Sequence, residues 1–568
     1  MSSATSNRFS GATAKISGVI AFFLGFTDLS IILLPSLHRL LVDRLNELPG
    51  VLGNAALIAT VFRGVVLILL ADGLARRKHR AWLVTVWILA LSVALPVVFN
   101  ISSGRHFSFV QIYPLLFLAG LIYARADFYA LPDSRSLWQS FRLLLVSSTI
   151  ALSGGIFVTY LRLDHLHLPL SFHNFISTLI PGFFGVETYV TQGEGRGAYF
   201  TYFVLLSLGI SSIFPALINF LSAPNPEPAL SPADDFEIRQ LLDQFGDRDS
   251  LGYFALRRDK SVVWSETRKA CIAYRVTMGV MLASGDPVGD PEAWPGAIES
   301  FMQMARIHGW IPAVAGASEL GAQVWTREAD LNALEIGDEA ILDTATFSLE
   351  GRPMRNVRQM VNRTYRLGYT ATACRAQDLT IAEARELGDA ADNWRHGNVE
   401  RGYSMALGRI GEPQDGQTIV VRAFKDEKLM AFVSLVPWGS QCASLDLMRR
   451  SPDCDPGLNE LLICSLMEQA PGLGITRVSL NFATFRAVLE RGEKLGAPVL
   501  TRFNRKFLVF VSRWIQIDSL YRFNEKFRPT WQPRFLLYQG GREFFRAGLA
   551  FLEAEGFIRT TLRPRKKV

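Results

Sequence analysis

The sequence predicts a multi-spanning α-helical membrane domain followed by an α/β (or α+β) cytoplasmic domain. Long apolar runs occupy residues 13–222, whereas the sequence beyond 223 has the composition of an ordinary globular protein. The charge divides at the same place, with 15 Lys and Arg against 9 Asp and Glu up to residue 222, and 44 against 43 after it. A chain of 568 residues is too long for one hydrophobic core, so at least two units are expected.

Six apolar segments are long enough to cross about 30 Å of hydrocarbon, which takes roughly 20 residues of helix. They are residues 13–36, 51–72, 81–100, 107–124, 143–161 and 200–222. The segment 171–190 is also apolar, but Pro181, Gly182 and Glu187 favour an interfacial or re-entrant position for it. The first segment is followed by further spans and by no convincing cleavage site, so it is not read as a signal peptide.

The distribution of basic residues predicts the orientation of these spans. With both ends inside, the inner segments carry nine Lys and Arg and the outer loops five, most clearly at "RRKHR". This places residues 223–568 in the cytoplasm, at the cell membrane. The five cysteines all follow residue 270 and form no CxxC pair, which suits reduced thiols. Asp28 and Arg63 lie in or near apolar spans, where a charge is costly and often functional unless it sits at a helix end.

The soluble half begins after a Pro- and Ala-rich linker. The predicted domains are a membrane domain at 1–222, a linker at 223–235, a cytoplasmic domain at 236–545 and a basic tail at 546–568. Strand-like segments such as "TIVVRAFK" and "CASLDLMR" alternate with helical patterns such as "GAIESFMQMARIHGW". This alternation predicts the α/β class, and the length of the region suits two lobes of similar size.

An arginine-rich segment stands out at residues 351–375, which contain six arginines and no acid. In a helix, Arg355, Arg358 and Arg366 fall on a face opposite the apolar side chains. A cationic face of this kind suits RNA phosphates or an anionic bilayer surface, and plain solvation is the alternative. The end of the sequence, "RTTLRPRKKV", adds five positive charges.

Several common motifs are absent from the soluble half. It contains no Walker A loop, dinucleotide fingerprint, G-x-S-x-G elbow or H-E-x-x-H sequence, which argues against an ATP-driven pump, an NAD enzyme and a common hydrolase. "QGEGRG" at 192–197 matches an acyl-CoA-binding spacing, but it lies between membrane spans and is interpreted as chance.

Six stretches between roughly 245 and 540 together resemble the catalytic domain of phosphatidylglycerol lysyltransferases, the MprF-type aminoacyl-lipid synthases. They are "GDPVG", "FSLEGRPMRNVRQMVNR", "ERGYSMALGR", "SLDLMRR", "VSLNFATFR" and "YRFNEKFRPTWQPRFLLY". The arrangement is most similar to the actinobacterial form with a short membrane region. The resemblance implies tandem GNAT-like acyltransferase lobes, and transfer of an aminoacyl group, most simply lysyl, from aminoacyl-tRNA to phosphatidylglycerol. The product lipid is less anionic, which favours resistance to cationic antimicrobial peptides.

Two departures from the family shape the expectations. The membrane region is shorter than in members with a lipid-flipping module, so flipping by this chain alone is not expected. Some actinobacterial relatives are fused to a lysyl-tRNA synthetase, whereas this sequence ends at "RPRKKV". A separate aminoacyl-tRNA synthetase is therefore expected to supply the charged tRNA.

The strand–loop–helix segment 444–470 supplies the candidate catalytic residues. The aminoacyl ester is already activated, so no metal or other cofactor is expected. We expect Asp446 to bind an ammonium group or accept a proton, Arg449 to face a phosphate, and Glu460 to be a second carboxylate. In a regular strand Asp446 and Arg449 point to opposite faces, so they can share a pocket only if the strand bulges or ends early.

Substrate-binding roles are assigned to four further residues. Ser404 and Asn481 are polar residues within the family-like stretches, and each also has a plain structural interpretation. The family pattern makes Lys526 and Arg528 candidates for contact with a phosphate.

Three alternatives stay open at this point. The same chemistry could use alanine or ornithine, or diacylglycerol as the acceptor. The chain could instead be a lipid transporter or flippase with a regulatory cytoplasmic domain. A binding module with a degenerate acyltransferase fold is the third, although the acid and arginines of "DLMRR" argue against it.

Overall fold

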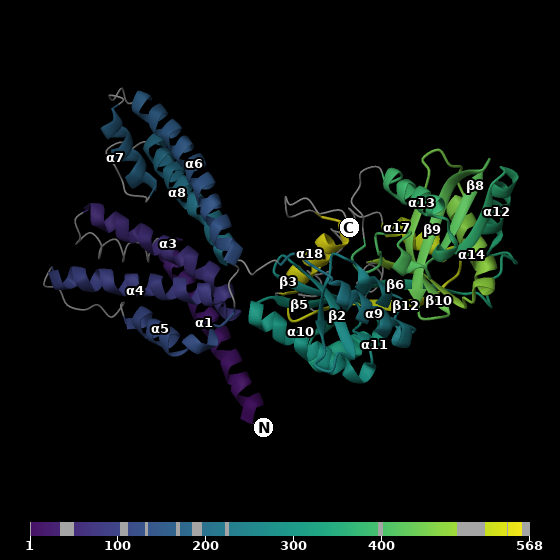
Figure 1. Cartoon of the computed structure of the whole chain (residues 1–568). Coiled ribbons are helices and arrows are strands. Elements are labelled where there is room, and N and C mark those ends of the chain that lie inside the picture. Colours follow the sequence, from purple (N-terminus) through teal and green to yellow (C-terminus); the bar gives the residue numbers. More distant parts are fainter. Residues whose placement is uncertain are drawn as a thin grey trace. The chain divides into compact units, whose positions relative to one another are not determined.

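The computed structural model describes residues 2–33, 50–102, 112–130, 134–165, 171–183, 196–221, 226–395, 402–484, 517–541 and 543–558. The chain divides into two compact units, of which the first comprises residues 1–224 with 306–310, and the second the remainder. Figure 1 shows the helical character of the first unit and the mixed character of the second.

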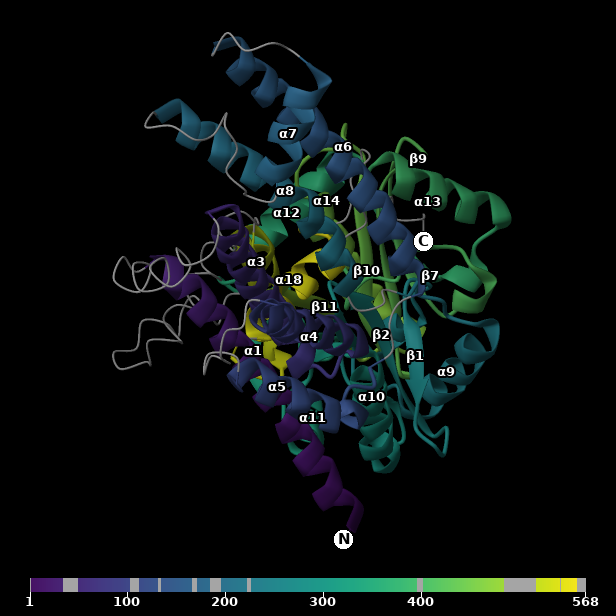
Figure 2. The same ribbon diagram turned by 90° about the vertical axis from the view of Figure 1, so that its left-hand side faces the viewer.

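The first unit consists of helices. These are α1 (Ser2–Leu33), α3 (Gly50–Ala75), α4 (His79–Ser102), α5 (Ile112–Tyr123), α6 (Ser134–His165), α7 (Phe172–Phe183) and α8 (Arg196–Leu221). Helices α6, α7 and α8 pack against one another, as Figure 2 shows. Within the described residues, three segments are long and apolar enough to cross a membrane: Ala12–Ser30, Trp138–Asp164 and Phe200–Leu221.

The other predicted spans are helical but are not all established as membrane-crossing. Shorter apolar helices cover His79–Ala94 and Ile112–Tyr123, and parts of the predicted spans 13–36, 107–124 and 200–222 lie outside the described residues. The number of six spans therefore stays a prediction. Helix α7 has 12 residues, too few to span a bilayer, as expected for the segment 171–190.

The described residues of the second unit form a twelve-stranded mixed sheet. Its strands are β1 (Ser261–Trp264), β2 (Ala270–Thr277), β3 (Val280–Ser284), β4 (Val288–Gly289), β5 (Ile311–Ala317), β6 (Asn332–Asp343), β7 (Thr370–Arg375), β8 (Ile419–Lys425), β9 (Lys428–Trp438), β10 (Cys442–Arg450), β11 (Arg477–Thr484) and β12 (Thr530–Tyr538). They pair in the order β1-β2-β3-β5-β12-β6-β11-β10-β9-β8-β7, and β4 pairs with β2.

The same arrangement occurs twice along this sheet. In the first lobe, the antiparallel strands β1, β2 and β3 are followed by α10 (Trp294–His308) and by β5, which pairs in parallel with β3. In the second lobe, β8, β9 and β10 are followed by α14 (Leu458–Gln469) and by β11, parallel to β10. Strand β12 joins the lobes because it inserts between β5 and β6. The predicted fold class, helical region then α/β region of two lobes, is confirmed.

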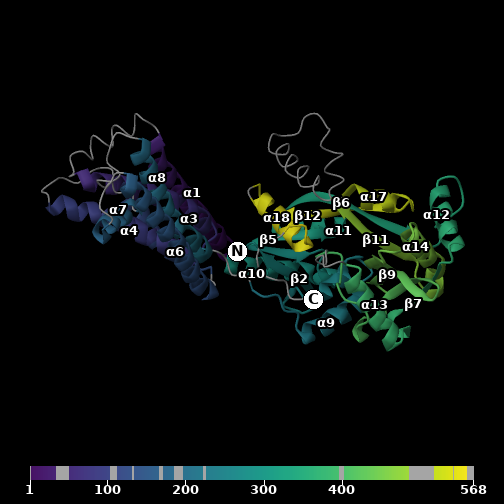
Figure 3. The same ribbon diagram turned by 90° about the horizontal axis from the view of Figure 1, so that it is seen from above.

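Helices cover both faces of the sheet (Figure 3). In the second lobe, α12 (Arg355–Arg366) and α14 pack on one face around Val421, Val433 and Leu435. Helix α13 (Ile381–Asn393) packs on the other face against Val420 and Phe432. The described part of this unit also contains α9 (Pro232–Phe245), α11 (Glu319–Ala329), α17 (Ile517–Glu525) and α18 (Glu543–Glu555).

Two predicted boundaries differ from the structure. The side chain of Ser231 caps α9, which begins at Pro232, so the last residues of the predicted linker are helical. The basic tail predicted from 546 is wrong up to Glu555, because α18 continues to that residue and buries Phe551 and Glu555 in the first lobe. The final residues 559–568 lie outside the described part.

Candidate active site

The parallel strands β10 and β11 separate soon after they begin. They pair only from Cys442 with Arg477 to Ser444 with Ser479, although both strands continue further. Next to the last pair, the backbone of Asn481 has a φ of +64°. We call residues 444–446 of β10 and 479–481 of β11 the divergence point. Backbone and side-chain groups at such a point are released from the sheet ladder and become available for binding.

A β-bulge at the divergence point places Asp446 and Arg449 on the same face. The register against β9 shifts between Leu445 and Leu447, so Asp446 is the extra residue. Leu445 and Met448 both pack on the core beneath α14, although they are three residues apart. The intervening bulge therefore turns Asp446 and Arg449 to the opposite face, where Leu447 packs beneath α13. The strand therefore bulges, which is the condition under which Asp446 and Arg449 can share a pocket.

Two hydrogen bonds from described residues help to hold the Asp446 carboxylate. Oδ1 accepts from the backbone N–H of Leu407 at 2.6 Å, and Oδ2 from the Ser434 hydroxyl at 3.4 Å. Only 8% of the residue is exposed. An acid held in this way has a fixed direction, which a proton-transfer or ammonium-binding role requires. Arg449 is half-buried, and its Nη1 donates to the Met448 carbonyl at 3.1 Å.

Asn481 joins the divergence point to the segment 402–407. Its Nδ2 donates to the Met405 carbonyl at 3.1 Å and to the Leu445 carbonyl. These two acceptors fix the orientation of the amide, so Oδ1 faces the other way. Asn481 is 5% exposed, and Oδ1 has no hydrogen-bond partner among the described residues; the Ser444 hydroxyl, which is fully buried, also has none there. Buried polar atoms without partners are rare, and at such a place they indicate a ligand.

Ser404 anchors the segment 402–407 rather than lining a pocket. Its backbone N–H donates to Glu555 Oε1 at 3.1 Å, and its hydroxyl donates to the same oxygen. The N–H of Tyr403 donates to Glu555 Oε2 at 2.6 Å. Ser404 is fully buried, so the predicted direct contact with substrate is not supported. The serine and α18 together hold Leu407 in place for Asp446.

A buried charged cluster supports the same segment from the first lobe. Arg257 donates to the carbonyls of Gly402 and Ala406, and Asp259 accepts from both Arg257 and Arg275. Burial opposes ionisation of Asp259, but the two arginines lower its pKa below the usual range. Burial lowers the pKa of Lys260, whose Nζ donates to the Ser284 hydroxyl at 2.6 Å.

A second buried network lies where the lobes join. Arg534 of β12 contacts Glu339 of β6, with 2.5 Å between Nη2 and Oε2, and Asp249, with 2.7 Å between Nη1 and Oδ1. Burial disfavours its charge, but Glu339 and Asp249 raise the pKa of Arg534. The hydroxyl of Ser479 also donates to Glu339, so this network reaches the divergence point.

The "GDPVG" loop belongs to the first lobe and stands beside this network. Burial raises the pKa of Asp286 to about 7, and nearby Asp249 adds to the rise. Both carboxylate oxygens accept from Ser318, at 2.9 Å from its N–H and 2.5 Å from its hydroxyl. Asp286 also borders a cavity of about 20 Å³, which has room for about one water molecule.

The structure does not bring Glu460 to Asp446. Glu460 lies in the first turn of α14, so it is on the opposite side of the sheet, where Oε1 accepts from Lys526 Nζ at 2.9 Å. Two predicted site residues thus pair with each other. Arg528 is exposed in the turn before β12, with a φ of +54°.

The predicted cationic helix exists as α12, but Arg358 has a different role from the other arginines. Its Nη1 donates to the carbonyls of Leu349 and, at 3.3 Å, Gly351. Arg355 and Arg366 are exposed, as predicted.

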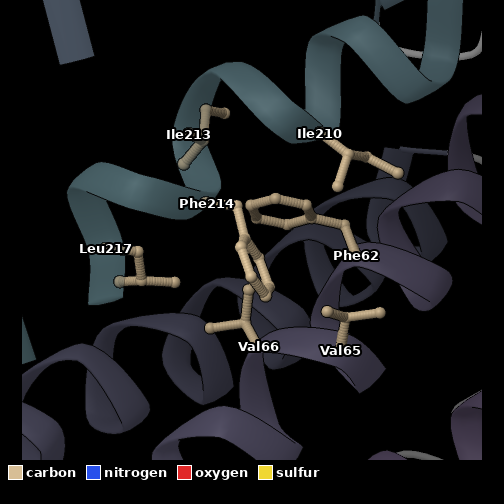
Figure 4. A pocket seen from close by; sticks show the side chains of 7 residues that line it. All are labelled: Phe62, Val65, Val66, Ile210, Ile213, Phe214 and Leu217. Atoms are coloured by element: carbon tan, nitrogen blue, oxygen red, sulfur yellow. The ribbon is translucent and has the colours of Figure 1, made fainter. Parts of the chain in front are cut away.

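One further cavity lies in the helical unit, between α3 and α8 (Figure 4). It is lined by Phe62, Val65, Val66, Ile210, Ile213, Phe214 and Leu217. Apolar walls of this kind offer no group for acid–base chemistry.

Sequence reasoning missed the residues that support the divergence point. Glu555 was assigned to a tail, and Arg257 and Lys260 were not singled out. A usable signal was present in β12, whose sequence TWQPRFLLY contains one charged residue, Arg534. No signal pointed to Glu555, whose partners are about 150 residues away in sequence.

Comparisons of the sequence with a family model and with individual proteins point to the same family. Residues 239–538 match the family model described as phosphatidylglycerol lysyltransferase, C-terminal. The lysylphosphatidylglycerol biosynthesis bifunctional protein LysX of Mycobacterium marinum is 41% identical over 519 residues, which are 89% of this chain and 46% of the relative. The LysX protein of Rhodococcus opacus is 41% identical over 506 residues, which are 87% of this chain and 44% of the relative. The chain thus spans less than half the length of these relatives.

Solved structures resemble the second unit more distantly. L-PGS from Bacillus licheniformis has a TM-score of 0.48 at 21% identity, covering 59% of this chain and 99% of its own. An Agrobacterium fabrum C-terminal domain, named after lysylphosphatidylglycerol synthetase, has a TM-score of 0.47 at 26% identity, with coverages of 58% and 100%.

Proposed function

The chain belongs to the phosphatidylglycerol lysyltransferase family, and from this we propose that it transfers an aminoacyl group, most simply lysyl, from charged tRNA to a headgroup hydroxyl of phosphatidylglycerol. The observation that carries the proposal is the divergence point. There a bulged, buried acid stands beside two buried polar atoms, Asn481 Oδ1 and Ser444 Oγ, that have no partner among the described residues.

The proposed step exchanges one ester for another. The hydroxyl oxygen of the lipid headgroup bonds to the aminoacyl carbonyl carbon, and the bond from that carbon to the tRNA ribose oxygen breaks. The proton of the lipid hydroxyl ends on the ribose oxygen. Asp446 accepts this proton in passing or binds an ammonium group of the aminoacyl moiety, and Arg449, on the same face, pairs with the lipid phosphate. The free energy of the existing ester drives the exchange.

The other candidate residues receive supporting roles. Asn481 Oδ1 accepts a hydrogen bond from a substrate N–H or O–H, while Ser404 positions the segment 402–407. Glu460 and Lys526 form an ion pair that holds the turn before β12 against α14, and Arg528 in that turn contacts a substrate phosphate. Glu460 thus acts through Lys526 and not on the reacting atoms.

The proposed location of each unit in the cell follows from the two substrates, a membrane lipid and a cytoplasmic tRNA. The first unit spans the cell membrane several times, and the second faces the cytoplasm, where charged tRNA is available. A synthetase, as a separate protein or in sequence beyond this chain, supplies that tRNA. The product replaces an anionic lipid with a cationic one, and the cell becomes less attractive to cationic peptides.

The test is lipid analysis of membranes that contain the full chain and phosphatidylglycerol. Parallel reactions receive tRNA charged with radiolabelled lysine, alanine or ornithine. We expect RNase-sensitive label in a phospholipid, strongest with lysine; strongest label with another amino acid would reassign the donor. Asp446→Asn should abolish the signal, and Glu386→Gln, which alters an exposed acid on α13, should keep it. No labelled lipid with any of the three, beside a working reference enzyme, would contradict the proposal.

A further inference from the structure

The outer face of α12 carries a cluster of exposed arginines. Arg352, just before the helix, and Arg355, Arg363 and Arg366 within it are exposed. None of the four forms an ion pair within the described ranges, although Arg363 lies near enough to Asp455 to help lower the pKa of that carboxyl group. The surface arginines Arg258, Arg268 and Arg327, by contrast, each contact a carboxylate. We refer to these four residues as the α12 arginines.

The charge at the start of the helix is unfavourable for the helix itself, whereas Arg363 and Arg366 lie in its last turn, where the helix dipole favours a cation. The first turn of α12 contains no acid and carries Arg355, although the positive end of a helix dipole disfavours a cation. Met354 at the N-cap provides no side-chain hydrogen bond. A sequence that breaks two local rules at an exposed place, without a structural gain, indicates a functional reason.

Helix α12 is held rigidly, so its outer face is a preformed surface. Helix α12 lies beside α14 (Figure 1). Met354, Val357, Val361 and Thr364 are buried on its inner face. Arg358 fastens the preceding loop by donating to the carbonyls of Leu349 and Gly351. The apolar stripe of the helix is therefore already used in the core, and the helix cannot insert into a bilayer by that stripe.

The end of the helix exposes two large apolar side chains beside the last arginines. Tyr365 is 46% and Leu367 36% exposed, and Gly368 turns the chain with a φ of +86°. Arginines combined with an exposed tyrosine and leucine are typical of a surface that rests on lipid headgroups, where tyrosine is enriched. RNA phosphates would satisfy the guanidinium groups, but they offer nothing to Leu367.

We propose that the outer face of α12 docks on an anionic bilayer surface, with Tyr365 and Leu367 at the headgroup level. The regulatory effect described next rests on the proposed function, whereas the docking itself does not. Because the reaction converts an anionic lipid into a cationic one, the product removes the charge to which the α12 arginines bind. Docking therefore weakens as product accumulates, and synthesis limits itself before the membrane becomes cationic.

The docking test uses the full chain in lipid nanodiscs and needs no transfer reaction. A fluorophore is attached at Gln359→Cys on the outer face of α12, or at Glu386→Cys on α13, after Cys374 and Cys454 are replaced by serine. Lipids with a nitroxide on the headgroup report proximity by quenching. We expect quenching at position 359 with phosphatidylglycerol, little with phosphatidylcholine alone or with lysylphosphatidylglycerol, and little at position 386 throughout.

A pair of charge-matched variants decides whether α12 is responsible. Arg363→Gln with Arg366→Gln should weaken docking roughly 30-fold at low salt. Arg327→Gln with Arg385→Gln removes the same charge from α11 and α13, and should leave docking unchanged. Equal losses in both variants, or quenching that ignores the headgroup, would overturn the proposal. Normal docking of the α12 variant combined with a lower affinity for uncharged tRNA would reassign the face to RNA.

The regulatory consequence is measured separately as the initial rate of transfer. At a fixed fraction of phosphatidylglycerol, replacing phosphatidylcholine by lysylphosphatidylglycerol should slow the unaltered chain several-fold and the α12 variant much less. Equal slowing of both would contradict self-limitation. If docking holds but no aminoacyl-tRNA gives labelled lipid, the proposed function fails while the docking surface stands.

Discussion

The carboxylate of Asp446 accepts a hydrogen bond from the backbone N–H of Leu407, with 2.6 Å between Oδ1 and N. This bond joins the bulge of β10 to the segment 402–407, which Glu555 of α18 holds from the other side. The position of the acid therefore depends on both lobes. A strand bulge alone would turn Asp446 to the correct face, but the segment 402–407 fixes its direction.

Asp446→Asn should abolish transfer and preserve the fold. The amide oxygen can still accept from Leu407, and the amide NH₂ can donate to the Ser434 hydroxyl, so the free energy of unfolding should change little. The rate of lipid labelling should fall by about 100-fold or more, since a proton-accepting group is lost. Asp446→Ala serves as the contrast, because it also costs about 1–3 kcal/mol by leaving the Leu407 N–H unpaired. Full activity of Asp446→Asn would exclude a charged role for this residue.

Asn481 combines an unusual backbone conformation with a side chain for which we propose a role in substrate binding, and two substitutions separate these properties. Asn481→Gly tolerates the φ of +64°, whereas Asn481→Ala must adopt a conformation that costs an L-residue about 1–2 kcal/mol. Both remove the amide and should lower transfer to a similar extent. The alanine variant should be less stable by about 1 kcal/mol in urea unfolding of the detergent-solubilised chain. Equal stabilities would show that this backbone position is not strained.

The sequence predicted these features unequally, for physical reasons. Hydropathy identifies apolar helices because every residue of a span meets the same environment, and alternation identifies strands such as β8 and β9. The bulge at Asp446 depends instead on Ser434 and Leu407, which lie 12 and 39 residues away. Helix α18 was mistaken for a tail because the basic residues after it dominated the composition, whereas "EFFRAGLAFLEAE" has a clear helical face.

Glu555→Ala should destabilise the second unit strongly. The substitution leaves the N–H groups of Tyr403 and Ser404, and the Ser404 hydroxyl, buried without their acceptor. Hydrogen bonds to a charged group contribute about 1.5–3 kcal/mol each, so a loss of about 3 kcal/mol or more is expected. Thermal unfolding should show it, and Glu555→Gln should be milder because one oxygen is kept. An unchanged midpoint for the alanine variant would mean that α18 does not hold this segment.

Asp286 should make stability depend on pH. Burial raises its pKa to about 7, above the unfolded value of about 3.9, so the folded chain binds the extra proton between these pH values. Its contribution to stability is therefore present below about pH 4 and is lost as the pH rises to about 7. Relative to Asp286→Asn, the unaltered chain should lose at most about 1.4 kcal/mol per pH unit in this window.

Urea unfolding at several pH values between 4 and 8 measures this difference. Glu427→Gln, which alters an exposed acid in the turn between β8 and β9, is the matched control and should follow the unaltered chain. Parallel profiles for the unaltered chain and Asp286→Asn would show that Asp286 ionises normally in the folded state.

The two charges that the sequence placed near membrane spans contact each other. Asp28 of α1 accepts from Arg63 of α3 through both oxygens, at 2.7 and 2.8 Å. The helices approach closely there because a Cβ at Gly25 would lie 2.5 Å from the Gly64 carbonyl oxygen. Asp28 is buried, so removing either partner leaves an unpaired charge in a poorly hydrated place.

Asp28→Ala and Arg63→Ala should each lower the stability of the first unit by about 3–5 kcal/mol, whereas replacing both residues by leucine should restore much of it. Thermal unfolding of the detergent-solubilised chain gives the three values, and their non-additivity measures the pairing energy. A purely structural pair predicts that the double leucine variant also retains lipid labelling. Stability without labelling in that variant would show that the pair serves the reaction as well as the helix contact.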